Sequence, residues 1–272
     1  MSETVLTTVG TGTLLPSAAR VSTGHLVETP GRSVLLDCGS GVLHGLARCH
    51  ASWAELDVVA LSHFHPDHLV DFPALLAAYR FRRRERPLTV IGPPGVTGML
   101  DKMAALYGEW MTDGGVPLRV VPLSAGEVWR SDEVALEAYP VHHTEESVAY
   151  RVETPHGVVG YTGDTGVTAG LGGWLRGCRI LLAECALPDP PAMDTHLSPS
   201  GLANLVDACL PELVVVTHVY PPIEPADMAA AVAARISPRP GASRPAVVAA
   251  RDGGRVRMTP YGVTVDPAGG PV

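Results

Sequence analysis

The chain has 272 residues, of which 46% are hydrophobic and 18% charged, and its formal net charge is −8. These values exclude a disordered or fibrous protein, because they are typical of globular chains that bury a substantial core. The negative charge repels polyanions, so small substrates are favoured and long RNA or DNA is not expected as a partner.

Short apolar runs rich in valine and leucine recur between glycine, proline and aspartate, and they predict many short strands. The predicted strands are residues 4–9, 33–36, 58–61, 88–91, 134–141, 148–152, 158–161, 180–182 and 213–216. Apolar periodicity predicts helices at residues 72–84, 96–108, 200–208 and 226–234. This order mixes hairpin-like neighbours with strand-helix-strand units, which favours layered sheets covered by helices over a purely parallel sheet.

Towards the C-terminus, residues 237–245 (SPRPGASRP) indicate an exposed loop, and residues 247–258 predict a closing hairpin around the Asp-Gly-Gly at 252–254. No internal repeat or strong domain boundary stands out, so we expect a single domain over residues 1–272. The five cysteines form no CxxC pair, and no stretch approaches the roughly 18 apolar residues of a spanning helix. We therefore expect a cytoplasmic protein without a disulfide framework or a membrane partner.

The segment LSHFHPDHLVDF, residues 61–72, carries the strongest chemical signal. An apolar strand runs directly into His63, His65, Asp67 and His68. Imidazole nitrogens and carboxylate oxygens bind zinc-type cations at about 2.0–2.2 Å, and ligands on a turn that leaves a strand can converge at that radius. His63 and His65 can face one centre while Asp67 and His68 face its neighbour, so the segment predicts part of a two-metal site.

Three other predicted strands end on residues of the same kinds, which can complete such a site. His142 and His143 follow VALEAYPV, Asp164 follows VVGYTG, and His218 follows LVVVT. Successive strand residues face opposite ways, so strand parity leaves the choice between His142 and His143 open. The scattered histidines at positions 25, 44, 50 and 156 are expected to be hydrogen-bonded structural residues or wet surface residues.

Together these motifs resemble those of the metallo-β-lactamase superfamily. The resemblance rests on GTGTLLPS, DCGSG, HxHxDH, the HT before SVAYR, GYTGDTG and VTHVYP, which occur in the family's order from about Thr7 to His218. Within the superfamily the motifs are most similar to the branch of tRNase Z and cyclic phosphodiesterases. The resemblance implies an α/β fold, a four-layer αββα sandwich of two mixed sheets flanked by helices, with the site at one edge between the sheets.

The resemblance also implies a ligand set for two divalent metal ions. It places His63, His65 and His143 on one metal, Asp67, His68 and His218 on the other, and Asp164 as a bridge. The family's ligand stands directly before Ser or Thr, which selects His143 over His142. Zinc is the expected metal, with manganese or iron as alternatives.

Three acidic or basic residues near these motifs have two interpretations each. Asp37 is either a turn-forming residue before Gly39 or an acid that orients a ligand histidine through its second ring nitrogen, with equal weight. Glu184 and His196 would most simply be a solvent-facing glutamate and a loop histidine. The tRNase Z-like branch instead implies that they pair near the metals and help to protonate the leaving group, and we favour this catalytic interpretation.

The expected chemistry is hydrolysis of an ester-type bond. Two metals about 3.5–4 Å apart can share one hydroxide, lower its pKa towards neutrality and clamp the oxygens of a displacement. Asp67 could both bind a metal and orient this hydroxide, so no serine or cysteine nucleophile is needed. The dense basic run, Arg80 to Arg86, is expected to be a solvated helix end, and its alternative is a phosphate-binding patch near the cleft.

The spacing of the motifs favours a small substrate. Bacterial tRNase Z enzymes generally carry a long tRNA-gripping arm between the positions of His143 and Asp164, whereas this stretch suffices for a strand hairpin and no more. We therefore favour a phosphodiesterase for a small or cyclic phosphodiester over a tRNA 3′-processing endoribonuclease. A lactonase or thioesterase is the acyl-hydrolase alternative, and a metal-binding sensor or partner protein is the non-enzymatic one. A homodimer is left open.

Overall fold

The computed structural model describes residues 3–108, 111, 116–238 and 243–266, and within them the strands form two mixed sheets. In spatial order, the larger sheet contains β15 (Gly262–Val265), β14 (Gly254–Thr259), β1 (Thr4–Gly10), β2 (Gly24–Glu28), β3 (Ser33–Leu36), β4 (Val58–Ala60), β5 (Leu88–Gly92) and β6 (Leu118–Pro122). The smaller sheet contains β13 (Ala246–Ala249), β12 (Leu213–Thr217), β11 (Ile180–Glu184), β10 (Gly157–Tyr161), β9 (Val148–Thr154), β8 (Ala135–Pro140) and β7 (Val128–Arg130). Strands β3 to β6 are parallel, and so are β10 to β13.

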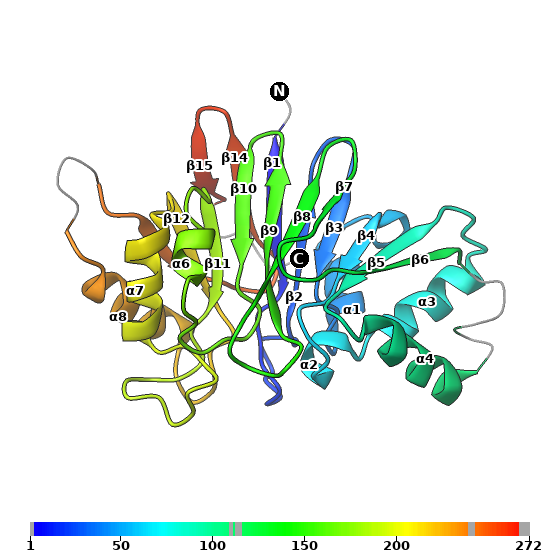
Figure 1. Ribbon diagram of the computed structural model, residues 1–272, viewed down its shortest axis with the longest axis horizontal. Coiled ribbons are helices and arrows are strands. Elements are labelled where there is room, and N and C mark those ends of the chain that lie inside the picture. The colour runs from blue at the N-terminus through cyan, green and yellow to red at the C-terminus, as the bar shows by residue number, and fades with distance from the viewer. Residues whose placement is uncertain (1–2, 109–110, 112–115, 239–242, 267–272) are drawn as a thin grey trace.

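Helices lie on both outer sides of this pair of sheets (Figure 1). Beside the larger sheet are α1 (Val42–Arg48), the 3₁₀ turn η1 (Trp53–Glu55), α2 (Pro66–Leu69), α3 (Phe72–Phe81) and α4 (Val96–Tyr107). Beside the smaller sheet are α6 (Leu171–Trp174), α7 (Pro199–Cys209) and α8 (Pro225–Arg235). Among the described helices, none has the length and apolar character needed to cross a bilayer.

Three apolar layers hold the sheets and helices together. In β3, Leu36 packs between the two sheets while its neighbour Leu35 packs on the helical side of the larger sheet. In β11, Leu182 likewise faces the other sheet and Leu181 faces the helices of the smaller one. Because successive side chains point to opposite faces, a strand that is buried on both faces must be apolar at nearly every position. This layering confirms the predicted αββα sandwich.

The predicted strands and helices are all present, with ends that move by a few residues. The helix expected at residues 72–84 ends earlier, at Phe81. The sequence does not predict α1, β2, β6 or β7, because these segments are short and carry glycine or charged residues within their apolar pattern.

The closing hairpin expected at residues 247–258 is wrong. Strand β13 pairs in parallel with β12 in the smaller sheet, whereas β14 pairs antiparallel with β1 in the larger sheet. Between them, the Asp252 carboxylate accepts hydrogen bonds from the backbone N–H groups of Thr11 and Val21, at 3.0 and 2.8 Å. The turn therefore carries the chain from one sheet to the other, and the hairpin partner of β14 is β15. The loop expected at 237–245 lies partly outside the described residues.

The arginine run after α3 contains a structural anchor. The guanidinium of Arg84 donates hydrogen bonds to the backbone oxygens of Ala54 and Leu56, and it lies over the ring of Tyr79, 4.4 Å from the centroid. Arg84 thus joins the end of α3 to the segment that leads into β4. The expectation of a purely solvated helix end is wrong for this residue, because its guanidinium is hydrogen-bonded to backbone carbonyls.

We expect Arg84→Ala to lower the free energy of unfolding by about 1–3 kcal/mol, because charged donors would be lost from buried carbonyl acceptors. Urea denaturation measures the change. Arg83→Ala is the matched control, since Arg83 is exposed and should shift stability by less than about 0.5 kcal/mol. Equal losses in the two variants would contradict the anchoring role.

Candidate metal centre

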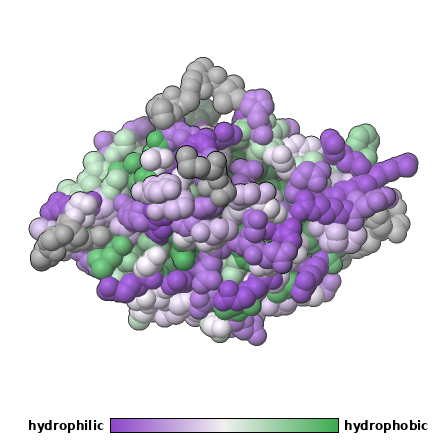
Figure 2. Space-filling model, turned by 90° about the horizontal axis from the view of Figure 1, so that it is seen from above, coloured by the Kyte–Doolittle hydropathy of each residue, from purple (hydrophilic) through white to green (hydrophobic). Residues whose placement is uncertain are grey.

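The residues with predicted chemistry lie at one end of the molecule, where parallel strands of both sheets end. Figure 2 views the other end, which carries the β14–β15 turn and is covered mostly by hydrophilic side chains. The loop after β4 supplies His63, His65, Asp67 and His68, and the ends of β8, β10 and β12 lead to His143, Asp164 and His218. Ligand atoms of these residues lie within 4.8 Å of one another in groups of three.

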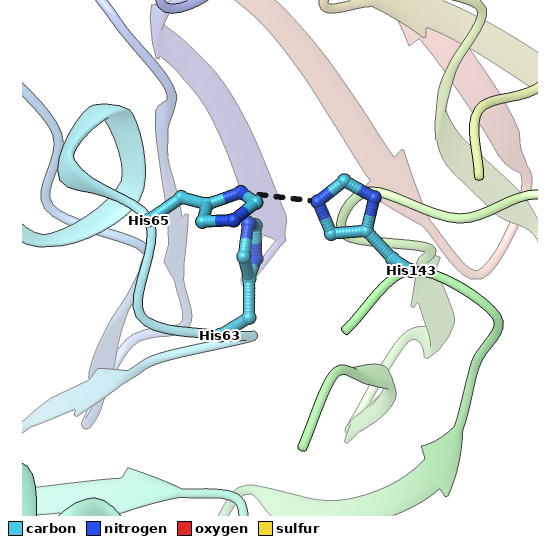
Figure 3. A group of neighbouring side chains, drawn as sticks. All are labelled: His63, His65 and His143. Carbon is cyan, nitrogen blue, oxygen red and sulfur yellow. Dashed lines mark hydrogen bonds between the residues drawn. The ribbon is translucent and has the colours of Figure 1, made fainter. Parts of the chain in front are cut away.

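His63, His65 and His143 form one group, which we call the His65 group. Figure 3 shows the three rings turned towards a common point, with His143 Nε2 3.1 Å from His65 Nδ1. The ring centroids are 4.7–4.9 Å apart. Three imidazoles from two separate loops therefore surround one small volume.

Asp67, His68 and His218 form a second group, the Asp67 group. The Oδ2 atom of Asp67 lies 3.3 Å from His218 Nε2 and 3.8 Å from His68 Nε2. All three side chains are buried. The carboxylate and two imidazoles give this volume a mixed oxygen and nitrogen donor set, which suits zinc and its first-row neighbours.

Asp164 lies between the two groups. Its Oδ2 atom is 4.0 Å from His63 Nε2 and 3.8 Å from His143 Nε2, both of the His65 group. The same oxygen is 3.4 Å from His68 Nε2 and 3.4 Å from His218 Nε2, both of the Asp67 group. One carboxylate oxygen thus lies near two imidazoles of the His65 group and two imidazoles of the Asp67 group.

The choice between the adjacent histidines is visible in the side chains. His143 joins the cluster, and its Nδ1–H donates a hydrogen bond to the backbone carbonyl of Thr195 at 3.0 Å. His142 points elsewhere, with a side chain 54% exposed and Nε2 3.5 Å from Asp194. The structure thus brings His143, and not His142, to the other predicted residues.

Two glycines let the site loops approach one another. A Cβ on Gly39 would lie 1.9 Å from the backbone oxygen of Asp67, and one on Gly166 would lie 1.8 Å from that of Asp194. The first contact holds the loop after β3 against the loop that carries His65. The second holds the loop after Asp164 against the segment that leads to His196. Side chains at either position would push these loops apart.

Asp37 contacts His68, as the orienting interpretation requires. Its Oδ2 atom is 2.7 Å from His68 Nδ1 and accepts hydrogen bonds from the hydroxyls of Ser62 and Tyr161. Asp37 adopts a left-handed backbone conformation with φ 60°, and so does His218 with φ 56°. Non-glycine residues adopt this conformation at a cost of order 1–3 kcal/mol, which is typical of functional sites.

Glu184 and His196 pair beside the two groups. His196 Nδ1 lies 2.8 Å from Glu184 Oε1, and the glutamate also accepts backbone N–H bonds, among them one from Thr165 at 2.7 Å. The alternative of a solvent-facing glutamate is excluded, because Glu184 is fully buried. The ring of His196 lies 4.8 Å from that of His143. The pair therefore borders the cluster.

The charge states favour a cation in this cluster. Burial, followed by the neighbouring His68, holds the pKa of His63 well below its ordinary value, so the His63 ring is neutral. Burial alone would raise the pKa of Asp164, but the facing imidazoles of His218 and His68 hold it well below its usual range. Among the described residues, the buried Nε2 atoms of His63 and His68 have no hydrogen-bond partner. Burial lowers the pKa of His68, but the carboxylates of Asp164 and Asp37 outweigh burial and hold this pKa well above its ordinary value, so the His68 ring is protonated without a metal. A divalent metal would take the place of one of its protons, and neutral imidazoles with an ionised carboxylate are then the donors that fit the implied metals.

Tyr220 borders the site without being predicted. Its ring lies 5.6 Å from that of His218 and 5.9 Å from that of His196. Burial, with the carboxylates of Asp67 and Asp164 next, raises the pKa of Tyr220 to about 12, so its hydroxyl keeps its proton. The signal in the sequence was its position two residues after His218.

His25 does not behave as expected. Its ring is fully buried edge-on against Tyr161 at 5.6 Å, and neither nitrogen has a hydrogen-bond partner among the described residues. Burial, with His68 and His218, lowers the pKa of His25 to about 3, so the ring is neutral. The other scattered histidines agree with expectation, since His44 and His50 are exposed and His156 Nδ1 lies 2.9 Å from the Thr4 hydroxyl.

Comparison with known proteins now decides the family. The sequence model of the beta-lactamase superfamily domain matches residues 32–219. The chain belongs to this superfamily. The match covers every residue of the His65 and Asp67 groups, together with Asp164, Glu184 and His196.

Relatives within the superfamily carry ribonuclease names. Ribonuclease BN of Erwinia tasmaniensis is 31% identical over 148 residues, which cover 53% of this chain and 48% of the relative. The chain thus spans about half the length of the curated relatives it first matches. Ribonuclease Z of Mycobacterium sp. (strain KMS) is 28% identical over 289 residues, covering 97% of this chain and 99% of the relative. These relatives confirm the tRNase Z-like branch that the motifs indicated.

A solved structure agrees with the fold. The crystal structure of the metallo-beta-lactamase fold protein YhfI from Bacillus subtilis superposes with a TM-score of 0.81. The superposition covers 94% of this chain and 100% of that chain at 18% identity. At this identity the likeness supports the superfamily fold alone.

Proposed function

We propose that the protein is a dinuclear metal-dependent hydrolase that cleaves a small phosphodiester, with zinc as its first candidate metal. The observation that carries this proposal is the Asp164 oxygen within 4.0 Å of imidazoles from both the His65 and the Asp67 groups. Such a carboxylate can bridge two cations. When bound, two cations would lower the pKa of a shared water and neutralise charge on the phosphate oxygens.

The protein's own residues supply the proton transfers. Asp67 lies at the centre of its group and can accept a hydrogen bond from the attacking water, which orients the water towards phosphorus. His196 keeps Nδ1 on Glu184, so its Nε2 atom is free to donate a proton to the leaving oxygen. Burial lowers and the bond to Glu184 raises the pKa of His196, and the net direction is upward, which favours the protonated acid.

The hairpin between the site residues supports a small substrate. Residues 143–164 are all described, and they contain only β9 and β10, which pair from Thr154↔Gly157 to Tyr150↔Tyr161. No arm is inserted among these residues. The net charge of −8 also opposes the binding of long polyanions.

Cleavage of RNA is the second candidate function. It is favoured by the similarity to Ribonuclease Z of Mycobacterium, which covers 99% of that protein. Because the alignment covers nearly all of both chains, a precursor tRNA is the alternative substrate.

One experiment tests the proposal. Metal content of the purified protein is measured by mass spectrometry, and the same sample is assayed with a 2′,3′-cyclic nucleotide, a 4-nitrophenyl phosphodiester, a precursor tRNA, a lactone and a thioester. Two metals per chain with turnover of the small diesters support the proposal. Turnover of tRNA alone, or of the lactone or thioester alone, would replace it, and bound metal without any turnover would favour a sensor or partner protein.

We expect Asp37→Asn to weaken metal binding by about 10–100-fold, because the amide no longer fixes the ring of His68 as a carboxylate does. Competition with a fluorescent chelator measures the affinity. Asp57→Asn is the matched control, since Asp57 also accepts a backbone N–H, from Ser33, but lies directly before β4, at the other end of that strand from the site. The expectation fails if both variants bind metal equally.

A further inference from the structure

A cleft opens beside the His65 group. It has a volume of about 890 Å³ and lies between α4 and the segment from His143 to β9. Phe64, Met99 and Val148 contribute apolar walls, while Lys102, Glu145 and Glu146 contribute charge. His65 itself lines the cleft, so a group bound there lies next to the predicted metals.

We propose that this cleft holds the uncharged organic group that stays on the phosphate during cleavage, a flat ring such as a nucleobase. The inference rests on the proposed phosphodiesterase function and names its substrate class. The volume is in the range of about 300–1,000 Å³ that is typical of small-molecule sites, and apolar walls favour the faces of a ring.

The charges of the cleft favour an uncharged occupant with a hydrogen-bond donor, such as the ring N–H of thymine. Among the described residues, the side chains of Glu145, Glu146 and Lys102 form no ion pair or hydrogen bond with one another or with other residues, so they are available to a ligand. Two carboxylates can accept hydrogen bonds from ring N–H or amino groups. They also repel a further phosphate, which opposes a nucleic acid chain continuing through the cleft.

The position of His196 decides which side of the phosphate enters the cleft. His196 is proposed to protonate the leaving oxygen, and it borders His143 and His218 but does not line the cleft. The leaving group therefore lies on the His196 side. The group in the cleft is the one retained by the product.

Gly98 in α4 offers a way to fill the cleft. A Cβ added to Gly98 has no heavy atom within 4 Å, and the backbone conformation there suits other residues. Gly98→Phe should therefore fold and occupy the space of the proposed ring. Gly173→Phe is the matched control, because Gly173 in α6 is equally open but lies outside this cleft.

The kinetic test uses the purified metal-loaded protein and two diesters with one leaving group, thymidine 5′-(4-nitrophenyl phosphate) and methyl 4-nitrophenyl phosphate. The ratio of their kcat/KM values should favour the thymidine ester, and Gly98→Phe should lower this ratio at least about tenfold, as expected for loss of a buried ring. Gly173→Phe should leave the ratio unchanged. An unchanged ratio in Gly98→Phe would overturn the inference.

A second readout does not depend on turnover. In protein labelled at the methionine methyl groups, thymidine alone should shift the NMR resonance of Met99 and leave that of Met193, which lies outside the cleft. Gly98→Phe should abolish the shift. If the protein cleaves no phosphodiester, the proposed function fails. The Met99 resonance still tests the cleft separately, because a resonance that thymidine does not shift would overturn the inference.

Discussion

Replacing Asp164 with alanine should remove both metals and lower kcat/KM by at least about 10³-fold, which corresponds to roughly 4 kcal/mol of transition-state stabilisation. The reason is that, in the part of the chain that the structure describes, its Oδ2 atom is the one oxygen within 4.0 Å of imidazoles from both groups. Without this carboxylate, each proposed metal position loses a negatively charged ligand, and no negative charge between them offsets the repulsion of the two cations. Elemental mass spectrometry and the best phosphodiester assay measure the two losses.

His65→Ala should also lose metal and activity, because it removes one of the three imidazoles of the His65 group. His142→Ala is the control for both variants, since its exposed ring pairs with Asp194 and points away from the cluster. It should keep metal and rate. The ligand assignment is wrong if His142→Ala strips the metal while His143→Ala retains it.

Much of this site was visible in the sequence, because the proposed ligand residues follow buried apolar runs. The carboxyl ends of parallel strands meet at one edge of a sheet, so the ends of β10 and β12 had to lie close together. That reasoning brings Asp164 and His218 together, whereas the resemblance to the superfamily implied their place near the loop after β4, which belongs to the other sheet.

What the sequence left open depends on tertiary contacts. Strand parity could not separate His142 from His143, because β8 ends at Pro140 and both residues lie beyond it. The left-handed backbone of Asp37 is held by four side-chain hydrogen bonds to Ser62, His68 and Tyr161, and no local preference predicts it. The wrong hairpin at residues 247–258 has the same origin, since alternation indicates a strand but does not name its partner.

Replacing His196 with alanine should lower kcat by about 10²–10³-fold for a substrate with a poor leaving group, because a positioned general acid contributes about that much. Metal content should not change, since the seven proposed ligands remain. A 4-nitrophenyl ester should be affected far less, because its phenolate leaves without protonation. Comparing alkyl and 4-nitrophenyl diesters of one nucleoside therefore separates acid catalysis from a general loss of structure.

Glu184→Gln extends this prediction, because Glu184 acts through His196. The amide keeps the shape of the buried side chain but removes the charge that raises the pKa of His196. The variant should show a smaller rate loss than His196→Ala, again greater for poor leaving groups. In a pH–rate profile, His196 should lose its proton at lower pH than in the unmodified protein. An equal loss of activity with every leaving group would assign Glu184 and His196 a structural role. Loss of metal from His196→Ala would instead make His196 a ligand, as its closeness to His143 and Asp164 permits.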